Sequence, residues 1–195
     1  STLTSSAISR SIIERLGGLT TSRLFPTDIL AAELTEASAI ESHPDWPGVL
    51  RMYDNDHNII GHALRTAPTQ DYLHGYQGPT DILIVLDQEA NKVARIRFRK
   101  SYDNEEYYER ILDTPDWLNL YDGMTLKEIL AIDQSKIEGV SGATHTSWAI
   151  ADSVSRRLAR FESDREPPLR EIPWRNIALV TLTAGAALFS FTRLR

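Results

Sequence analysis

The chain of 195 residues is 42% hydrophobic and 25% charged, which is enough apolar content for one domain of ordinary size with its own core. Its formal net charge of −6 argues against a nucleic-acid-binding protein, because phosphate backbones require basic surfaces. Without cysteine, these residues hold no disulfide, no cysteine-ligated metal and no iron–sulfur cluster.

The first 48 residues are predicted to form a helical segment ahead of the main domain. Apolar side chains recur at helical spacing over residues 6–16, and a pair of glycines then ends that helix. A second, short helix is predicted to begin just after a proline, with Thr27 as its N-cap. Residues 35–48 are rich in turn-forming residues and are predicted to be a loop that leads into a sheet.

The period of hydrophobicity then changes to two, which predicts antiparallel strands. Residues 49–53 and 59–66 flank a cluster of turn formers at residues 54–58, so this pair is predicted to be a β-hairpin. A second pair follows. Residues 81–87 hold a continuous apolar run, as expected of a strand covered on both faces, and residues 94–99 alternate apolar side chains with arginine.

The next part of the domain is predicted to be helical. Residues 103–112 are predicted to form a helix with Asp103 as its N-cap, ended by the Thr-Pro pair that follows. Thr125 and Glu128 form a capping-box signature, so a short helix is predicted after Thr125. The order of helices, two hairpins and more helices predicts an α+β domain: a small antiparallel sheet of hairpins with flanking helices.

The most informative stretch is residues 138–146, Glu-Gly-Val-Ser-Gly-Ala-Thr-His-Thr, which runs into an amphipathic helix predicted over residues 147–162. Such a small turn presents a hydroxyl at the start of a helix, where free backbone N–H groups and the positive end of the helix dipole favour a phosphate. Ser141, Thr144 and Thr146 are also the residue types that a helix start prefers as N-caps. The residues alone leave both interpretations open.

A second informative loop contains Gly75, Tyr76, Gly78 and Pro79. Two glycines around an aromatic residue allow the backbone to approach a flat ligand closely, and the proline sets the exit into the following strand. Taken alone, this loop is weak evidence for a ligand site. Its position ahead of a strand pair, with Ser-Gly-Ala-Thr downstream, makes the combination more specific.

Together these stretches resemble the FMN-binding domain family. The resemblance covers roughly residues 50–162 and rests on Ser-Gly-Ala-Thr-x-Thr at residues 141–146, after an acidic residue and before a helix, and on Gly-x-x-Gly-Pro at residues 75–79. The family includes the covalent flavoprotein subunits of the sodium-pumping NADH:quinone reductase and of Rnf complexes. It also includes the extracytoplasmic domain of NosR-type membrane proteins, to which the loop and strand pair look most similar.

The resemblance implies a cofactor site. In the family, a separate flavin transferase uses FAD to join FMN by a phosphoester to the last threonine of the four-residue core, which is Thr144 here. The cofactor-binding residues expected from the two motifs are Thr144, Ser141, Gly142, Ala143, Thr146, Gly75, Tyr76, Gly78 and Pro79. The transferase motif normally opens with Asp three residues before the serine, where this chain has Glu138. No catalytic residue and no metal site is assigned.

Other side chains have both a structural and a functional interpretation. His62 lies on a predicted strand, where a histidine is more often a surface or satisfied core residue. The basic side chains of residues 95–100 form either a cationic wall near the flavin phosphate or a redox partner, or a solvated face, and the solvated face is favoured. A hydrolase that uses a hydroxyl of residues 141–144 with His145 is disfavoured, because a catalytic base must be oriented by a third group in space.

Residues 177–192 are sixteen uncharged residues between arginines. At roughly 1.5 Å per residue a helix here is about 24 Å long, slightly short of the ~30 Å hydrocarbon core, and snorkelling arginines with local thinning can cover the difference. We expect a transmembrane anchor, joined to the FMN-binding domain of residues 49–162 by a proline-rich linker at residues 163–176. A buried C-terminal helix is the alternative. The chain is expected to continue past Arg195.

The expected function is that of a membrane-anchored flavoprotein electron-transfer domain. It would be the electron carrier of an oxidoreductase system rather than a stand-alone enzyme, because the chemistry resides in the flavin. Its expected partners are a flavin transferase, a quinol- or iron–sulfur-linked membrane redox partner and the lipid bilayer. The charges beside the span would by themselves leave the domain in the cytoplasm, but the resemblance implies an extracytoplasmic, periplasmic location. The alternative is a membrane-anchored sensor or assembly factor that binds flavin non-covalently.

Overall fold

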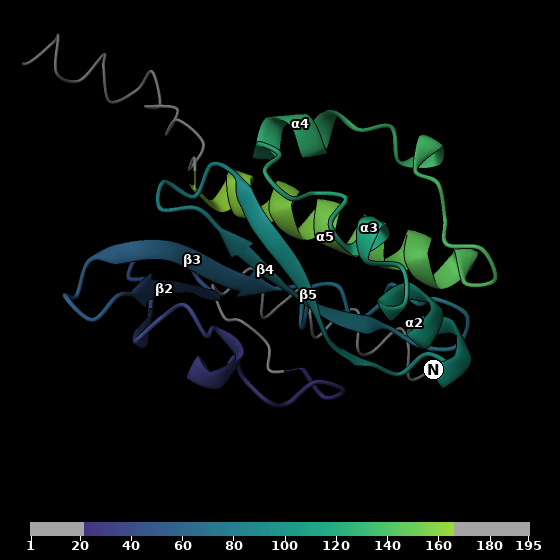
Figure 1. The fold of residues 1–195 in the computed structure, drawn as a ribbon, viewed down its shortest axis with the longest axis horizontal. Helices are drawn as coiled ribbons and strands as arrows, with labels where there is room; N and C mark the ends of the chain where they lie inside the picture. The colour runs from purple at the N-terminus through teal and green to yellow at the C-terminus, as the bar shows by residue number, and fades with distance from the viewer. Residues whose placement is uncertain (1–21, 166–195) are drawn as a thin grey trace, which may run out of the picture. The chain divides into compact units, whose positions relative to one another are not determined.

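Residues 22–165, the part of the chain that the computed structural model describes, fold into a five-stranded antiparallel sheet with helices against one face (Figure 1). Each strand pairs with its neighbours in sequence, so the sheet order is β1-β2-β3-β4-β5. The strands are β1 Ala39–Ser42, β2 Val49–Tyr53, β3 Ile59–Arg65, β4 Thr80–Leu86 and β5 Val93–Ser101. The predicted α+β class and both predicted hairpins are therefore confirmed.

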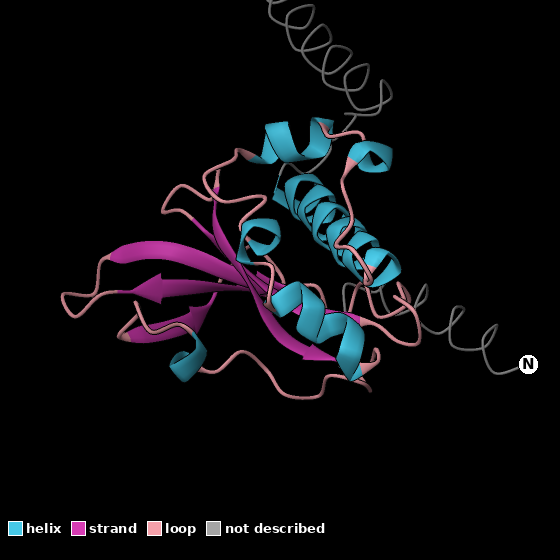
Figure 2. Ribbon diagram, turned by 45° about the vertical axis from the view of Figure 1, so that its right-hand side comes forward, coloured by secondary structure: helices cyan, strands magenta, loops and turns pink. Residues whose placement is uncertain are grey.

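The helices come mostly from the second half of the chain. In Figure 2 the helices that follow β5 gather along one side of the sheet, while the N-terminal segment with its single helical turn lies on the other. They are the 3-10 helix η1 Ala31–Glu33, α2 Glu105–Leu112, α3 Pro115–Leu118, α4 Leu126–Ala131, the 3-10 helix η2 Gln134–Lys136 and α5 Thr144–Arg165. The predicted capping box of α4 is confirmed, because Thr125 accepts from the backbone N–H of Glu128 and Glu128 accepts from that of Thr125.

The core lies between α5 and the helical face of the sheet. All seven residues of β4 are buried, which confirms the strand covered on both faces. Ile82, Ile84 and Leu86 join the cluster under the helices, whereas the intervening side chains of the same strand join a second cluster on the opposite face. α5 contributes Ile150, Val154, Leu158 and Phe161, whose spacing by three and four residues forms one buried stripe.

Two predictions for the N-terminal part of the chain are wrong. Residues 39–42 are strand β1, paired with β2, and not part of a loop. This edge strand is four residues long and only half-buried, so it carries no alternation that a sequence pattern reveals. The short helix does not begin at Thr27. Its single turn is η1, and the carbonyl of Thr27 instead accepts hydrogen bonds from the guanidinium groups of Arg65 and Arg99.

Several predicted segments fall outside the described residues. These are the helix over residues 6–16 and the anchor over residues 177–192. The predicted linker at residues 163–176 is described only at its start, where α5 continues as far as Arg165. Within residues 22–165, no helix is both long enough and apolar enough to cross a membrane.

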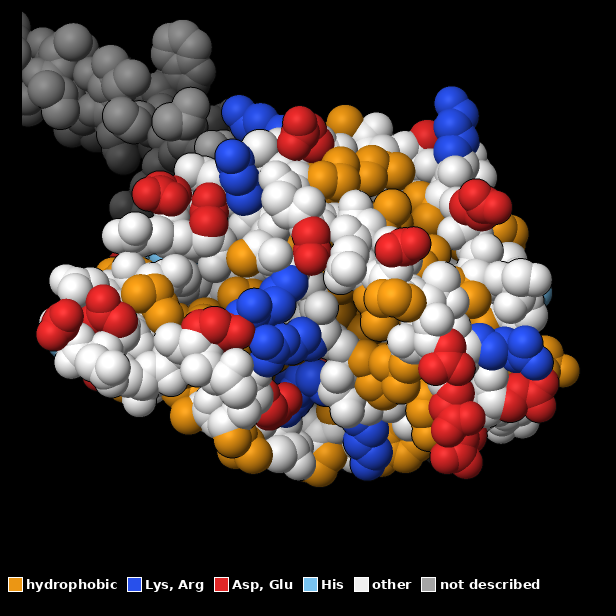
Figure 3. Space-filling view, in the orientation of Figure 1, with side chains coloured by type: hydrophobic (Ala, Val, Ile, Leu, Met, Phe, Trp, Pro, Cys, Tyr) orange, Lys and Arg blue, Asp and Glu red, His pale blue; other side chains and the backbone are white. Residues whose placement is uncertain are grey.

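Basic side chains of β5 hold the N-terminal segment against the far face of the sheet. Arg99 bonds Glu33 at 2.5 Å and Asp81 at 2.6 Å, and Arg95 and Arg97 both contact Glu36. Figure 3 shows basic side chains as a blue column in the centre of the view, with acidic side chains beside it. The arginines are therefore neither a solvated face nor a free cationic wall, because each one pairs with a carboxylate of this chain.

Candidate functional site

The turn before α5 is held in one conformation by Gly142. The backbone N–H of Ala143 donates to the carbonyl of Val140 at 2.9 Å, and Gly142, at the third position of the turn, has a φ of 77°. A type II turn requires a positive φ at this position, which glycine adopts without steric cost. The Ser-Gly-Ala sequence therefore dictates the direction in which the chain enters the helix.

α5 begins at Thr144, three residues earlier than the sequence pattern predicted, so Thr144 is the first residue of the helix and does not precede it. Ser147 is the first residue of the helix whose backbone N–H reaches a carbonyl, that of Ala143 at 2.9 Å. Within the described residues, the N–H groups of Thr144, His145 and Thr146 have no acceptor. Three unpaired donors at the positive end of a 22-residue helix favour an anion.

The three candidate hydroxyls have different surroundings. Ser141 is exposed, whereas Thr146 is 1% exposed and its Oγ1 donates to the carboxylate of Asp103 at 2.5 Å. Thr144 is half-buried, and its Oγ1 lies 3.4 Å from the carbonyl oxygen of Val140. Thr144 therefore combines partial burial, a single weak hydrogen bond and a position beside the unpaired N–H groups.

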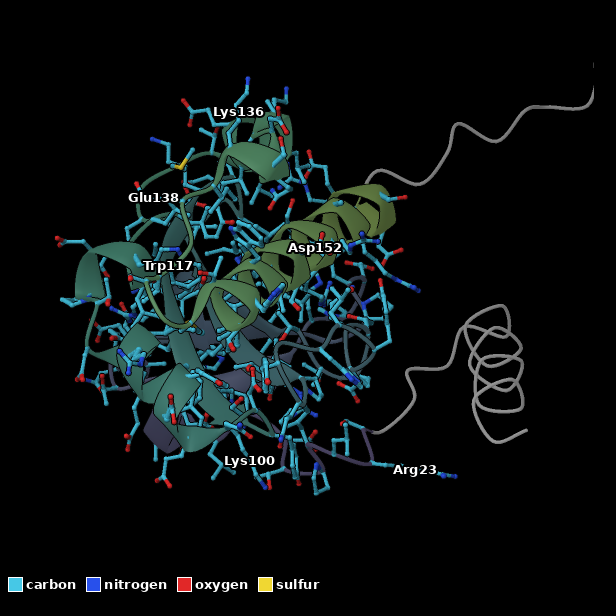
Figure 4. All side chains as sticks on the ribbon, turned by 90° about the vertical axis from the view of Figure 1, so that its right-hand side faces the viewer. Arg23, Lys100, Trp117, Lys136, Glu138 and Asp152 are labelled. Atoms are coloured by element: carbon cyan, nitrogen blue, oxygen red, sulfur yellow. The ribbon has the colours of Figure 1, made fainter. Side chains whose placement is uncertain are left out.

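The strand-like segment that leads to the turn is fixed by two indole groups. Trp117 Nε1 donates to the carbonyl of Glu138 at 3.0 Å, and Trp148 Nε1 donates to the carbonyl of Ile137 at 2.9 Å. Figure 4 shows Trp117 and Glu138 on neighbouring elements at the same side of the molecule. The side chain of Glu138 is exposed. The backbone at this position is thus fixed while its acidic side chain remains open to a partner.

Asp103 connects the two loops that the sequence singled out. Its carboxylate accepts hydrogen bonds from the backbone N–H groups of Tyr76 at 2.9 Å and Gln77 at 2.7 Å, and from Thr146 at the start of α5. The prediction that Asp103 caps α2 is therefore wrong, because Asn104 occupies the N-cap position. Burial disfavours the charged form of Asp103, but these hydrogen bonds outweigh burial and lower the pKa of Asp103 below its ordinary value.

The two glycines of the first loop approach the protein's own backbone closely. A Cβ at Gly75 would lie 2.1 Å from Asp103 Oδ2 and 2.9 Å from the Cα of Thr146, and a Cβ at Gly78 would lie 2.4 Å from the carbonyl oxygen of Tyr102. Pro79 is also buried, and its carbonyl accepts from the N–H of Tyr102. Gly75 therefore lets the loop pack against the start of α5, and Gly78 lets it pack against Tyr102 just after β5.

A cavity of about 300 Å³ opens beside the first turn of α5. Tyr76 of the first loop and Tyr107 of α2 line it together with residues 142–146. The two tyrosine rings meet edge to face, with centroids 4.9 Å apart. The structure thus brings Tyr76 to the same cavity as Gly142, Ala143, Thr144 and Thr146. Tyr107 falls within the helix predicted over residues 103–112, and no local signal in the sequence marks it as part of a site.

A second cavity, of about 820 Å³, lies on the Ser141 side of the turn and is lined by apolar residues that include Trp117, Leu120 and Ile137. Arg110 of α2 also lines it, and its guanidinium lies close to the turn. A Cβ built at Gly142 would be 3.2 Å from Arg110 Nη1. Among residues 22–165, no side chain or carbonyl makes a hydrogen bond or ion pair with the Arg110 guanidinium. Arg110 therefore lies beside the turn with no counter-ion among the described residues.

The histidines that the sequence raised contribute no catalytic arrangement. His62 is 4% exposed, its Nδ1 lies 3.3 Å from the carbonyl oxygen of Asp87, and burial lowers its pKa. His145 is exposed and meets the Trp148 ring edge-on. Within the described part of the chain, no acidic side chain hydrogen-bonds His145, so the third group that a Thr144–His145 hydrolase requires does not appear there.

Comparison with known proteins identifies the family. Residues 75–159 match the family model described as FMN-binding domain, and this range contains both loops and most of α5. Among solved structures, NqrC of Shewanella oneidensis is similar to the chain, with 13% identity, a TM-score of 0.39 and coverage of 64% of this chain and 66% of that one. The match thus spans just under two thirds of NqrC and is too distant to carry a functional argument. No curated protein matches the chain. Over residues 75–159, the chain is therefore similar to the FMN-binding domain family.

Proposed function

We propose that the chain is a flavoprotein electron-transfer domain that carries FMN through a phosphoester on Thr144. The observation that carries this proposal is the unequal state of the three hydroxyls. The hydroxyl of Thr146 is hydrogen-bonded to Asp103, and Ser141 lines the other cavity, on the opposite side of the turn. Thr144 shares one cavity with three N–H groups that have no acceptor among the described residues. A phosphate joined to Thr144 would meet donors that otherwise have no acceptor.

The charge beside the turn fits the same group. The guanidinium of Arg110 lies against Gly142 without an ion-pair partner among the described residues. A phosphate carries negative charge and three acceptor oxygens, so it suits both a guanidinium and the positive end of a helix. The residues that would hold the FMN phosphate are therefore Thr144 and the N–H groups that follow it, with Arg110 nearby.

The aromatic lining suits the flat part of the cofactor. Tyr76 and Tyr107 line the cavity together with the start of the helix, and Tyr76 is 61% exposed. Flavins bind well against aromatic faces, and an exposed edge allows electrons to pass to a partner. When bound, FMN supplies one- and two-electron chemistry, while the chain supplies position and electrostatics.

Attachment of FMN requires a separate transferase. In that transfer the Thr144 hydroxyl would be the acceptor for the FMN half of FAD: a P–O bond to threonine would replace the pyrophosphate P–O bond, AMP would be the leaving group, and the hydroxyl proton would pass to a base of the transferase. Among the described residues, the Thr144 hydroxyl bonds a carbonyl oxygen, and the neighbouring His145 points its ring at Trp148, so this part of the chain offers no oriented base. The exposed Glu138 is available to a transferase where its motif normally has Asp.

We propose further that residues 177–192 anchor the domain in a membrane, with the FMN domain periplasmic and a quinol- or iron–sulfur-linked redox partner in the membrane. Support comes from the uncharged stretch between arginines and from the family resemblance. Reporter fusions at each end of residues 177–192 test the orientation. Recovery of the full chain as a dispersed monomer in the soluble fraction would contradict the anchor.

Co-expression of the full chain with a flavin transferase tests the attachment. After denaturation and electrophoresis, we expect a band that fluoresces under ultraviolet light, which Thr144→Ala abolishes and Ser141→Ala retains. Glu138→Asp should not reduce labelling. Peptide mass spectrometry that finds the adduct on Ser141 or Thr146, or on none of them, would overturn the assignment. Flavin that co-purifies but is released on denaturation would favour the alternative, a membrane-anchored sensor or assembly factor with non-covalent flavin.

A further inference from the structure

Arg157 is a buried cation that no carboxylate contacts within residues 22–165. It lies on α5, is 4% exposed, and donates from Nε to the carbonyl of Arg65 at 3.0 Å and from Nη2 to the carbonyl of Gly48 at 3.3 Å. Asp164 attracts it at longer range but ion-pairs with Arg160 at 3.5 Å. Buried charges are ordinarily paired, because removing a charge from water is costly.

The charge of Arg157 persists at neutral pH. Burial lowers the pKa of Arg157 to about 10, which still leaves the guanidinium protonated near pH 7. Its two hydrogen bonds use Nε and Nη2, and no described residue accepts from Nη1. Two neutral carbonyls thus solvate a cation that retains an unused donor.

A cavity of about 590 Å³ adjoins Arg157, at the end of the molecule where β2 begins and β3 ends. Arg157 and Arg65 both line it. Arg65 is already balanced by Asp81 at 3.5 Å and Asp28 at 3.8 Å, and the other acidic lining residue, Glu41, is exposed. Of the two buried guanidinium groups that line the cavity, only that of Arg157 has no carboxylate in contact among the described residues.

This cavity is separate from the FMN site. Arg157 follows Thr144 by 13 residues on the same helix, which at roughly 1.5 Å per residue is about 20 Å along the axis. The Ser-Gly-Ala-Thr turn is at one end of α5, and Arg157, which lines the cavity, lies in the third turn from the other end. A ligand at Arg157 would leave the flavin-bearing turn untouched.

We propose that the cavity beside Arg157 binds a small anion through a carboxylate or phosphate group. A guanidinium presents paired N–H donors whose geometry matches these two groups, and such charge-assisted hydrogen bonds strengthen where water is excluded. The backbone contacts from Gly48 and Arg65 orient the guanidinium before the anion arrives. This site does not depend on the proposed flavin function.

Calorimetric titration of the full chain with inorganic phosphate and with succinate, at constant ionic strength set by chloride, tests the proposal. We expect saturable binding that Arg157→Met weakens at least about tenfold and Arg157→Lys weakens less, because lysine keeps the charge but loses the paired donors. The matched control is Arg156→Met. Arg156 is the next residue on the helix, is exposed and pairs with Asp152 at 2.8 Å, so its loss should change affinity less than about twofold.

A variant that leaves Arg157 in place keeps the proposal testable if Arg157→Met unfolds. Ser42 lines the cavity from the exposed end of β1, and Ser42→Trp should block the anion while thermal unfolding without ligand remains near that of the wild type. Sedimentation with phosphatidylcholine vesicles, with and without phosphatidic acid, separates a lipid phosphate from a free one. Absence of saturable binding to either anion and to acidic vesicles, or equal binding by wild type and Ser42→Trp, would overturn the site.

Discussion

The basic side chains on the two sides of the sheet differ in whether a carboxylate pairs with them. On the face that carries the N-terminal segment, Arg95, Arg97 and Arg99 each contact a carboxylate. On the helical face, Arg110 and Arg157 have no carboxylate in contact within residues 22–165. The first face uses its cations to hold two segments of the chain together. The helical side therefore retains two cations that no described carboxylate contacts, Arg110 beside the turn before α5 and Arg157 beside a cavity at the end of the sheet.

The largest expected effect comes from separating the first loop from α5. Gly75→Val should lower the free energy of unfolding by about 3 kcal/mol, because its side chain would overlap Asp103 and the backbone of Thr146. Urea denaturation measures this loss, and flavin labelling should fall with the folded fraction. The matched control is Gly123→Ala. Gly123 has a φ of 78°, but a Cβ there would meet no atom within 4 Å, so only backbone strain of about 1 kcal/mol is expected. Equal losses in both variants would refute the packing argument.

Removing the ion pairs that hold the N-terminal segment should lower the free energy of unfolding without changing flavin attachment. Arg99→Met removes one partner of Asp81, whose side chain is 1% exposed, and should lower the free energy of unfolding by about 2 to 3 kcal/mol. Glu36→Gln provides the exposed comparison and should lower the free energy of unfolding by less than about 1 kcal/mol. This loss should become smaller still as added salt screens the ion pair. The fraction of folded protein that carries covalent flavin should stay unchanged in both. A loss of labelling in folded Arg99→Met protein would show that the two faces are not independent.

The sequence predicted those parts of the fold that depend on local patterns. The buried run of β4, the two hairpins, the capping box of α4 and the stripe of α5 all follow from periodicity or from caps a few residues apart. Strand β1 escaped prediction because four half-exposed residues at a sheet edge carry almost no pattern. The role of the β5 arginines was also not predicted, since their partners in the N-terminal segment lie more than 50 residues away along the chain.

The site was predictable only in part, for the same reason. The Ser-Gly-Ala-Thr turn and the start of a helix are local, so the hydroxyl and the unpaired donors were foreseen. Asp103 looked like an N-cap because an aspartate just before a helix usually is one. Its actual partners are 26 and 43 residues away, and only the fold brings them together. Tyr107 and Arg110 were likewise placed beside the turn by the packing of α2 against α5.

Asp103 offers a test that depends on pH. Asp103→Asn should lower the free energy of unfolding at pH 7 by about 1 to 2 kcal/mol, because charge-assisted hydrogen bonds from Thr146 and two backbone N–H groups are weakened. The pKa of Asp103 is lowered in the folded protein, so its stabilisation is fully present above the unfolded pKa near 4 and is lost as pH falls through the lower folded value. The difference between wild type and Asp103→Asn should therefore shrink on acidification below about pH 4. A constant difference between pH 7 and pH 3 would contradict an ionised Asp103 as the link.

The smallest expected effect on stability comes from Arg110→Gln. This substitution tests the difference between paired and unpaired cations most directly, because it removes a cation without a described partner and leaves the core intact. Arg110 is exposed and bonded to no described residue through its guanidinium, so Arg110→Gln should leave the urea midpoint unchanged. If Arg110 attracts the phosphate that becomes attached to Thr144, the initial rate of flavin transfer should fall about fivefold at low salt, and the difference should narrow as salt screens the charge. Arg156→Gln removes a cation of the same type that is already paired with Asp152, and it should transfer flavin at the wild-type rate. Equal rates for Arg110→Gln and wild type at every salt concentration would mean that the helix donors alone hold the phosphate.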